Sequence, residues 1–179
     1  MIFLTRKAEF SSAHYYWNDA WPPEENIRVF GKCANRNGHG HNYTLEVTVA
    51  GSVDPTSGFV VDLKELKDIL EREVVSVYDH RHLNLEVPEF KTTIPTTENI
   101  AIAIWQRLDN KIPNAKLHRV RVYEIPDLFA DYYGETALEF PGAFSQTRNR
   151  IREIEAKALG KLRQVKPSEN RTASAEDSE

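Results

Sequence analysis

The sequence is poor in several features, and each shortage excludes a class of protein. Its 179 residues contain a single cysteine, Cys33, which excludes an internal disulfide framework and points to a reducing, cytoplasmic compartment. No apolar run approaches the length that spans a bilayer, and the N-terminus lacks the apolar stretch of a signal peptide. The formal net charge is only −4, with acidic and basic residues interspersed. We therefore expect neither a nucleic-acid partner nor a membrane partner.

The length is enough for one folded domain with a sizeable core, followed by a tail. We place that domain at 1–140, because the composition changes after Pro141. Residues 141–165 are rich in charge and contain one apolar helical stripe, so we expect a helical extension there. From 166 to 179 the chain is rich in Ser, Glu and Ala, which is typical of a disordered tail. The extension could cover an apolar patch, mediate assembly or remain a solvated appendage.

What the sequence does contain is a group of histidines, His14 and the triplet His39-Gly40-His41. Residues two apart in an extended segment face the same side, so His39 and His41 can present their imidazoles together. The triplet alone is weak evidence, but the apolar faces of two expected strands, 2–13 and 42–50, each continue into a histidine. Paired as a hairpin, these strands would bring the histidines into one site. Three neutral imidazoles leave one position open on Zn²⁺, which is the arrangement of a catalytic zinc site.

The periodicity of the rest of the chain predicts the fold class. The long polar excursion over 15–38 is too long for an ordinary hairpin connection, and we interpret it as a functional loop. A polar, irregular stretch over 79–95 also suits a loop. The expected elements, in chain order, are strands over 2–13 and 42–50, helices beginning near Asp62 and Thr96, and strands over 118–125 and 128–133. This order predicts an α+β fold with both helices on one sheet face.

Other polar residues suggest chemistry, with ordinary alternatives beside them. Cys33 lies six residues before His39, although a lone cysteine is more often a small buried hydrophobe. The Asp79-His80 pair could relay protons or could be a surface pair. Glu124 extends an apolar strand face, so it either faces a pocket or lies at a solvated strand end. We interpret the two remaining histidines as ordinary surface residues: His82 and His118.

Several separated motifs together match a known family. In chain order they are FSSAH at 10–14, FGKC at 30–33, NGHGHNY at 37–43, YDH at 78–80 with LN at 83–84, PTTEN at 95–99 and VYE at 122–124. With these motifs the chain resembles the family of 6-pyruvoyltetrahydropterin synthases and 6-carboxytetrahydropterin synthases. The resemblance covers about residues 2–136.

The resemblance implies a set of site residues. They are the Zn²⁺ ligands His14, His39 and His41, the general base Cys33 with its charge relay Asp79 and His80, and the pterin-binding residue Glu124. Residues 96–98 match the family's stretch near the substrate, but helix capping explains them equally well. The resemblance also implies the tunnelling fold: a four-stranded antiparallel sheet with two helices on one face. Three such sheets join into a barrel, and two trimers stack into a homohexamer with active sites between subunits.

The implied activity is that of a zinc-dependent lyase of tetrahydrobiopterin biosynthesis. It converts 7,8-dihydroneopterin triphosphate to 6-pyruvoyltetrahydropterin, with loss of triphosphate and internal redox transfer. The close alternative is 6-carboxytetrahydropterin synthase of queuosine biosynthesis, a carbon–carbon lyase that releases acetaldehyde. Five residues separate Cys33 from His39, a longer spacing than in the queuosine enzymes, which favours the pyruvoyl branch. Related lyases that shorten the dihydroneopterin side chain and a non-catalytic pterin-binding module are further alternatives.

Overall fold

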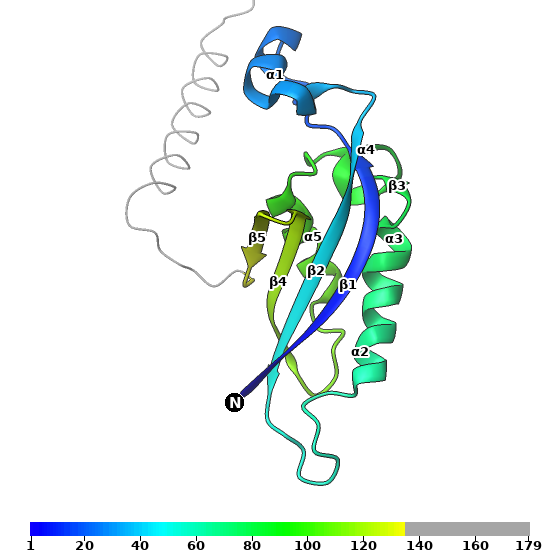
Figure 1. Ribbon diagram of the computed structural model, residues 1–179, viewed down its shortest axis with the longest axis vertical. Coiled ribbons are helices and arrows are strands. Elements are labelled where there is room, and N and C mark those ends of the chain that lie inside the picture. Colours follow the sequence, from blue (N-terminus) through cyan, green and yellow to red (C-terminus); the bar gives the residue numbers. More distant parts are fainter. Residues whose placement is uncertain (135–179) are drawn as a thin grey trace, which may run out of the picture. The chain divides into compact units, whose positions relative to one another are not determined.

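The computed structural model describes residues 1–134, which form a sheet backed by helices (Figure 1). The sheet has five strands in the order β3-β1-β2-β4-β5. Their bounds are β1 (Ile2–His14), β2 (His39–Gly51), β3 (Arg81–His82), β4 (Lys116–Ile125) and β5 (Leu128–Tyr132). The expected helical extension at 141–165 and tail at 166–179, with the end of the 1–140 domain, lie outside the described residues.

The helices are α1 (Pro23–Phe30), η1 (Gly31–Ala34), α2 (Leu63–Leu70), η2 (Glu71–Val75), α3 (Ser76–Tyr78), α4 (Leu83–Glu86), η3 (Pro88–Lys91) and α5 (Thr97–Leu108). The segments α2, η2 and α3 follow one another without a break and form one long helical segment. This segment and α5 lie on the same face of the sheet, which confirms the α+β prediction. In residues 1–134, no helix is both long and apolar enough to cross a membrane.

Both principal helices begin where a polar side chain caps them. The Asp62 carboxylate accepts hydrogen bonds from the backbone N–H groups of Lys64 and Glu65, as the sequence predicts. The Thr96 hydroxyl likewise accepts the N–H of Asn99 at the start of α5.

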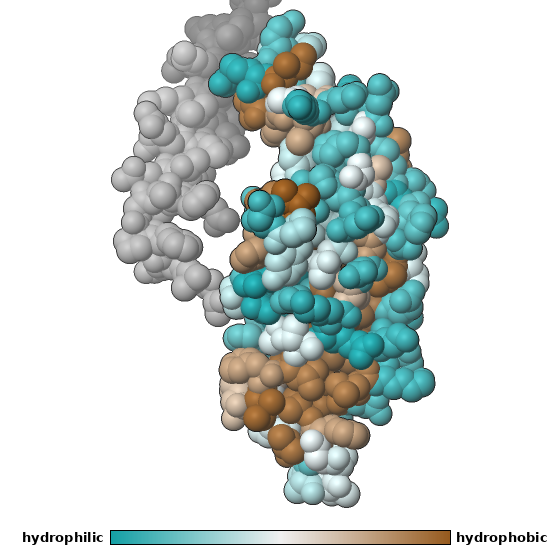
Figure 2. Space-filling model, viewed as in Figure 1, coloured by the Kyte–Doolittle hydropathy of each residue, from teal (hydrophilic) through white to brown (hydrophobic). Residues whose placement is uncertain are grey.

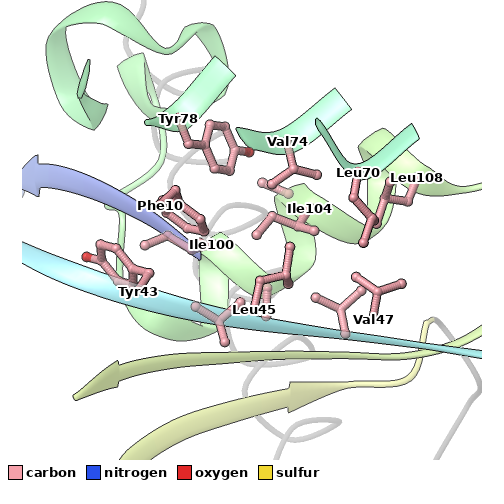
Figure 3. Close-up of a cluster of buried hydrophobic side chains, with 14 of the residues drawn as sticks. Phe10, Tyr43, Leu45, Val47, Leu70, Val74, Tyr78, Ile100, Ile104 and Leu108 are labelled. Atoms are coloured by element: carbon pink, nitrogen blue, oxygen red, sulfur yellow. The ribbon is translucent and has the colours of Figure 1, made fainter. Parts of the chain in front are cut away.

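The core fills the space between the helices and the sheet (Figure 3). Alternate residues of β2 point into it, and the helices contribute one stripe each. Its members include Phe10, Tyr43, Leu45, Val47, Leu70, Val74, Tyr78, Ile100, Ile104 and Leu108. The Phe10 ring stacks on Tyr43 with centroids 5.0 Å apart, and Tyr78 meets Phe10 edge-on. This packing fixes the ends of β1 and β2 relative to the helices.

The pairing of β1 with β2 matters most for the site. The two strands are antiparallel along their whole length, from Ile2 opposite Gly51 to His14 opposite His39. Ser12 faces His41 in the same register. The expected hairpin-like pairing is therefore confirmed, and it carries the three histidines to one end of the sheet.

The sheet differs from the prediction by one short strand. Four antiparallel strands were expected, but β3 adds a fifth that runs parallel to β1. Backbone hydrogen bonding explains the addition: the N–H of His80 donates to the Ser11 carbonyl, and the Asp79 carboxylate accepts the N–H of Ser11. A strand of two residues is too short to produce a period-two pattern in the sequence.

The excursion over 15–38, expected as a loop, contains the helix α1 and the short turn η1. Asn26, which is buried, organises this segment. Its side chain accepts the N–H of Asn18 and donates to the carbonyls of Asn18, Trp21 and Pro22. Because hydrogen bonds rather than an apolar stripe hold this helix, the sequence pattern did not reveal it.

The face of the sheet opposite the helices is largely polar (Figure 2). Glu46, 8% exposed, lies there between Lys7 at 2.9 Å and Arg119 at 3.1 Å. Asp131 forms two hydrogen bonds with Arg121, at 2.7 and 2.6 Å. Figure 2 also shows a hydrophobic area toward the end where β1 begins, and Ile2 and Phe3 of that strand are exposed.

Candidate functional site

Three histidine side chains meet at the end of β1 and β2. One ring nitrogen from each of His14, His39 and His41 lies within 4.8 Å of the others. The Nε2 atoms of His14 and His39 are 3.2 Å apart. His14 is fully buried, whereas His39 and His41 are half-buried. The group is thus anchored in the core on one side and accessible on the other.

The orientation of His14 is fixed by its second ring nitrogen. Nδ1 lies 2.9 Å from the carbonyl oxygen of Pro95 and 3.2 Å from the Tyr43 hydroxyl. A carbonyl can only accept, so Nδ1 carries the proton and Nε2 keeps its lone pair. Such a partner on the outer nitrogen is the usual support of a metal-binding histidine.

The electrostatics of the group also favour neutral imidazoles. Burial lowers the pKa of His14 well below its ordinary value, although the hydrogen bond to Pro95 opposes this. Burial, and then the neighbouring His41, lower the pKa of His39. Neutral imidazole is the form that binds a metal ion.

These residues fit Zn²⁺. Nε2 of His41 is buried and forms no hydrogen bond among the described residues, so it is available as a ligand. Three imidazoles whose nitrogens converge are a donor set that zinc prefers, and they leave a fourth position open. The structure thus brings together the three histidines that the sequence analysis selected as candidate ligands.

Glu124 lies beside the histidines. It is 8% exposed, and its Oε1 is 3.3 Å from Nε2 of His41. Its Oε2 accepts hydrogen bonds from the Tyr16 hydroxyl, at 3.2 Å, and from the Thr97 hydroxyl. Of the two alternatives left open by the sequence, the structure supports a partnered carboxylate in the site over a solvated strand end.

Cys33 lies in η1 and is half-buried. Its carbonyl oxygen accepts the N–H of Tyr16 at 2.8 Å, which ties η1 to the chain just after β1. Burial, followed by the negative charge of Glu124, raises the pKa of the Cys33 thiol. Ionising it near neutral pH therefore needs a nearby positive charge, and no cation within residues 1–134 lowers the pKa of this thiol.

Asp79 and His80 form a pair immediately before β3. Nδ1 of His80 donates to Oδ2 of Asp79 at 2.7 Å, and the side chain of His80 is 84% exposed. Hydrogen bonds from the Ser11 backbone and from His80 hold the pKa of Asp79 below its usual value. Within residues 1–134, no hydrogen bond or ion pair connects this pair to Cys33.

Sequence reasoning missed two residues at the centre of the site, Tyr16 and Thr97. Tyr16 has the same parity as His14, a signal that was available but lay beyond the expected strand. Thr97 belongs to the stretch 96–98, which matches the family's stretch near the substrate but which helix capping explains equally well; in the structure its hydroxyl donates to Glu124. One expectation also needs correction: His82 is not an ordinary surface residue, because both its ring nitrogens are buried. His118 is exposed, as expected.

Comparison with known proteins adds independent findings. A family model described as 6-pyruvoyl tetrahydropterin synthase matches residues 3–135. The 6-pyruvoyl tetrahydrobiopterin synthase of Homo sapiens is 41% identical over 132 residues, which cover 74% of this chain and 91% of the human protein. The solved structure of Caenorhabditis elegans 6-pyruvoyl tetrahydropterin synthase is 40% identical, with a TM-score of 0.71, and the match covers 75% of this chain and 96% of that chain. A putative 6-carboxy-5,6,7,8-tetrahydropterin synthase of Archaeoglobus fulgidus is 41% identical over 93 residues, or 52% of this chain and 73% of that protein.

Proposed function

Because the chain belongs to the 6-pyruvoyl tetrahydropterin synthase family, we propose that it is a zinc-dependent 6-pyruvoyltetrahydropterin synthase. Its substrate is 7,8-dihydroneopterin triphosphate, and its product serves tetrahydrobiopterin biosynthesis. The observation that carries this proposal is the adjacency of a three-histidine group and a buried carboxylate, His41 and Glu124 being 3.3 Å apart. One part of the site suits a metal, and the other suits a flat polar heterocycle.

Glu124 binds the pterin. The amino-pyrimidinone edge of a pterin offers N–H donors, and Oε1 of Glu124, the oxygen not bonded to Tyr16 or Thr97, can accept from them. Since Glu124 is almost fully buried, these hydrogen bonds form away from competing water. Its position beside the histidines fixes the distance between the ring and the metal site.

His14, His39 and His41 hold Zn²⁺, with His14 set in position by Pro95. When bound, the ion polarises the side-chain oxygens of the substrate and acidifies the adjacent C–H groups. The side-chain carbinol next to the ring is oxidised to a ketone as the ring C=N bond is reduced, so electrons stay within one molecule. Loss of triphosphate then completes the pyruvoyl group, and no external redox cofactor is needed.

Cys33 is the general base that removes and returns protons at the side-chain carbons. Because the pKa of its thiol is raised, Cys33 ionises near neutral pH only when a positive charge lies nearby. The bound metal is one such source. Asp79 and His80 are the charge relay, but they reach Cys33 from another subunit, because no hydrogen bond or ion pair within residues 1–134 connects them to it.

The family resemblance also implies an assembly, and we propose the same assembly for this chain. In a homohexamer of two stacked trimers, three sheets join edge to edge into a barrel, as in the tunnelling fold. Such closure pairs the exposed edges of β3 and β5 and encloses the polar sheet face. The compartment proposed for this assembly is the cytoplasm, in agreement with the single free cysteine.

Product analysis tests the proposal. The zinc-loaded full-length protein is incubated with 7,8-dihydroneopterin triphosphate, and the products are identified by mass spectrometry. The expected products are 6-pyruvoyltetrahydropterin and triphosphate. Formation of 6-carboxytetrahydropterin and acetaldehyde would instead assign the chain to the queuosine branch. The Archaeoglobus fulgidus relative is named for this carboxy product. Absence of turnover with zinc bound would contradict the enzyme proposal and favour a pterin-binding module.

A further inference from the structure

One residue, Tyr16, contacts three members of the candidate site. The Tyr16 hydroxyl donates to Oε2 of Glu124 at 3.2 Å, and its ring meets the His14 ring edge-on with centroids 5.0 Å apart. Its backbone N–H donates to the carbonyl of Cys33 at 2.8 Å. A single side chain and its backbone thus connect the proposed pterin-binding residue, a metal ligand and the base.

We propose that Tyr16 is a positioning residue, which orients the Glu124 carboxylate so that one of its oxygens faces the bound pterin. The proposal rests on the proposed function, because it assigns a role within the pterin site. Tyr16 acts through Glu124 and takes no part in proton transfer.

The hydrogen bonds to Glu124 are divided unequally between its two oxygens. Oε2 accepts from Tyr16 and from Thr97, whereas the polar contact that Oε1 makes within residues 1–134 is with Nε2 of His41, at 3.3 Å. A carboxylate oxygen has about two lone-pair sites, so Oε2 is filled by its protein donors. A metal held by Nε2 of His41 would take that nitrogen away from Oε1 and leave this oxygen able to accept from a ligand. Tyr16 and Thr97 therefore fix the carboxylate by one oxygen and leave the other available.

The position of the Tyr16 hydroxyl is itself well determined. The ring packs edge-on against Phe30, with centroids 5.9 Å apart, and Phe30 stacks on Trp21 at 5.7 Å. This row of aromatic rings runs from the site into α1. With the backbone also bonded to η1, the phenol reaches Glu124 with little conformational freedom, which is the condition for orienting a partner. The role of the segment 15–38 in this proposal is to hold the Tyr16 hydroxyl in place beside Glu124.

A binding measurement tests the role of Tyr16 apart from turnover. The probe is neopterin, and its fluorescence is followed on titration with the zinc-loaded full-length protein. Tyr16→Phe removes the hydroxyl and keeps the ring, so we expect neopterin binding to weaken about tenfold, as for one lost hydrogen bond to a charged group. With dihydroneopterin triphosphate as substrate, KM should rise by a similar factor while kcat changes little. Zinc content should stay the same.

The matched control is Tyr123→Phe. Tyr123 lies on the strand of Glu124, but its hydroxyl accepts from Arg121 on the other face of the sheet. The same chemical change there should leave neopterin binding unaltered. A double-mutant cycle supplies the sharper comparison: in a Glu124→Gln background, Tyr16→Phe should weaken binding no further.

Each other outcome has a definite meaning. If Tyr16→Phe binds neopterin as tightly as the wild type, or more tightly, Tyr16 does not position Glu124. An equal loss in the Glu124→Gln background would show that Tyr16 acts independently of the carboxylate, which also overturns the inference. If the wild-type protein binds no neopterin at all, the proposed function fails, and this role for Tyr16 fails with it.

Discussion

Nε2 of His41 lies 3.3 Å from Oε1 of Glu124, so a proposed metal ligand and the proposed pterin-binding group are immediate neighbours. The two groups come from different strands, β2 and β4, which pair directly. A metal bound to Nε2 of His41 would keep that nitrogen from pairing with Oε1 of Glu124. Metal binding and the availability of the carboxylate are therefore coupled through a single atom.

That coupling predicts a dependence of pterin binding on the metal. Removal of zinc by a chelator should weaken neopterin binding, because Nε2 of His41, 3.3 Å from Oε1 of Glu124, is then free to compete with the pterin for that oxygen. Fluorescence titrations with and without the chelator measure the effect, and zinc added back should restore it. Unchanged binding in the metal-free protein would mean that the pterin site is independent of His41.

The three histidines should bind one zinc ion per chain. His39→Ala removes an accessible ligand and leaves the core intact, so we expect the loss of stoichiometric zinc in metal analysis of the purified protein. His118→Ala, a change at an exposed histidine outside the site, should bind zinc as the wild type does. If both variants retain zinc equally, the metal lies elsewhere.

Zinc should also stabilise the folded chain, since the converging ligands exist only in the native state. At a free zinc concentration 100 times its Kd, the gain in unfolding free energy is about 2.7 kcal/mol. Thermal unfolding should therefore show a higher Tm with zinc than with chelator. The difference should vanish in His39→Ala, and a difference that persists there would point to another site.

The separation of Cys33 from Asp79 and His80 predicts complementation between inactive variants. Cys33→Ala and His80→Ala should each lower turnover by a factor of about 10² to 10⁴, the usual contribution of general acid–base catalysis. Unfolding the two together and refolding them as mixed oligomers should restore part of the activity, because some sites then combine an intact Cys33 with an intact His80. No recovery, with mixed oligomers verified, would place both groups in one subunit's site.

Glu89 should give stability a pH dependence. Burial raises its pKa, but hydrogen bonds from Arg107, at 2.5 and 2.9 Å, and from Tyr78 outweigh this and bring the pKa below its ordinary value of 4.5. A lowered pKa stabilises the folded state above pH 4.5, and that stabilisation disappears as the pH falls through the folded-state value. The Tm difference between wild type and Glu89→Gln should therefore be large at neutral pH and shrink in acid. Glu24→Gln, at an exposed position, should show no such trend.

The predicted parts of the fold are those encoded by regular patterns. The parity of β1 and β2 placed His14 and His41 correctly, and the caps at Asp62 and Thr96 gave the starts of both main helices. The alternation of β4 also brought Glu124 to the correct face. In each case one side of an element is buried along its length, so the sequence repeats the structural period.

The parts that escaped prediction depend on isolated contacts. The helix α1 is held by the amide of Asn26, and β3 exists because Asp79 and His80 bond to one residue of β1. Tyr16 reaches Glu124 across a separation of 108 residues in the chain. Isolated contacts of this kind produce no repeating pattern in the sequence. The residues that make them come together only in the folded chain.

Because the register between β1 and β2 is continuous, the number of residues in β1 sets the position of His14 in the site. His14 lies opposite His39 because the pairing that begins with Ile2 opposite Gly51 continues without an inserted or missing residue. One residue inserted into β1 would move His14 to the opposite face of the sheet, away from its partners, without touching any functional residue. The length of this strand is therefore itself a functional determinant, and a change in spacing far from the histidines should be as damaging as replacing one of them.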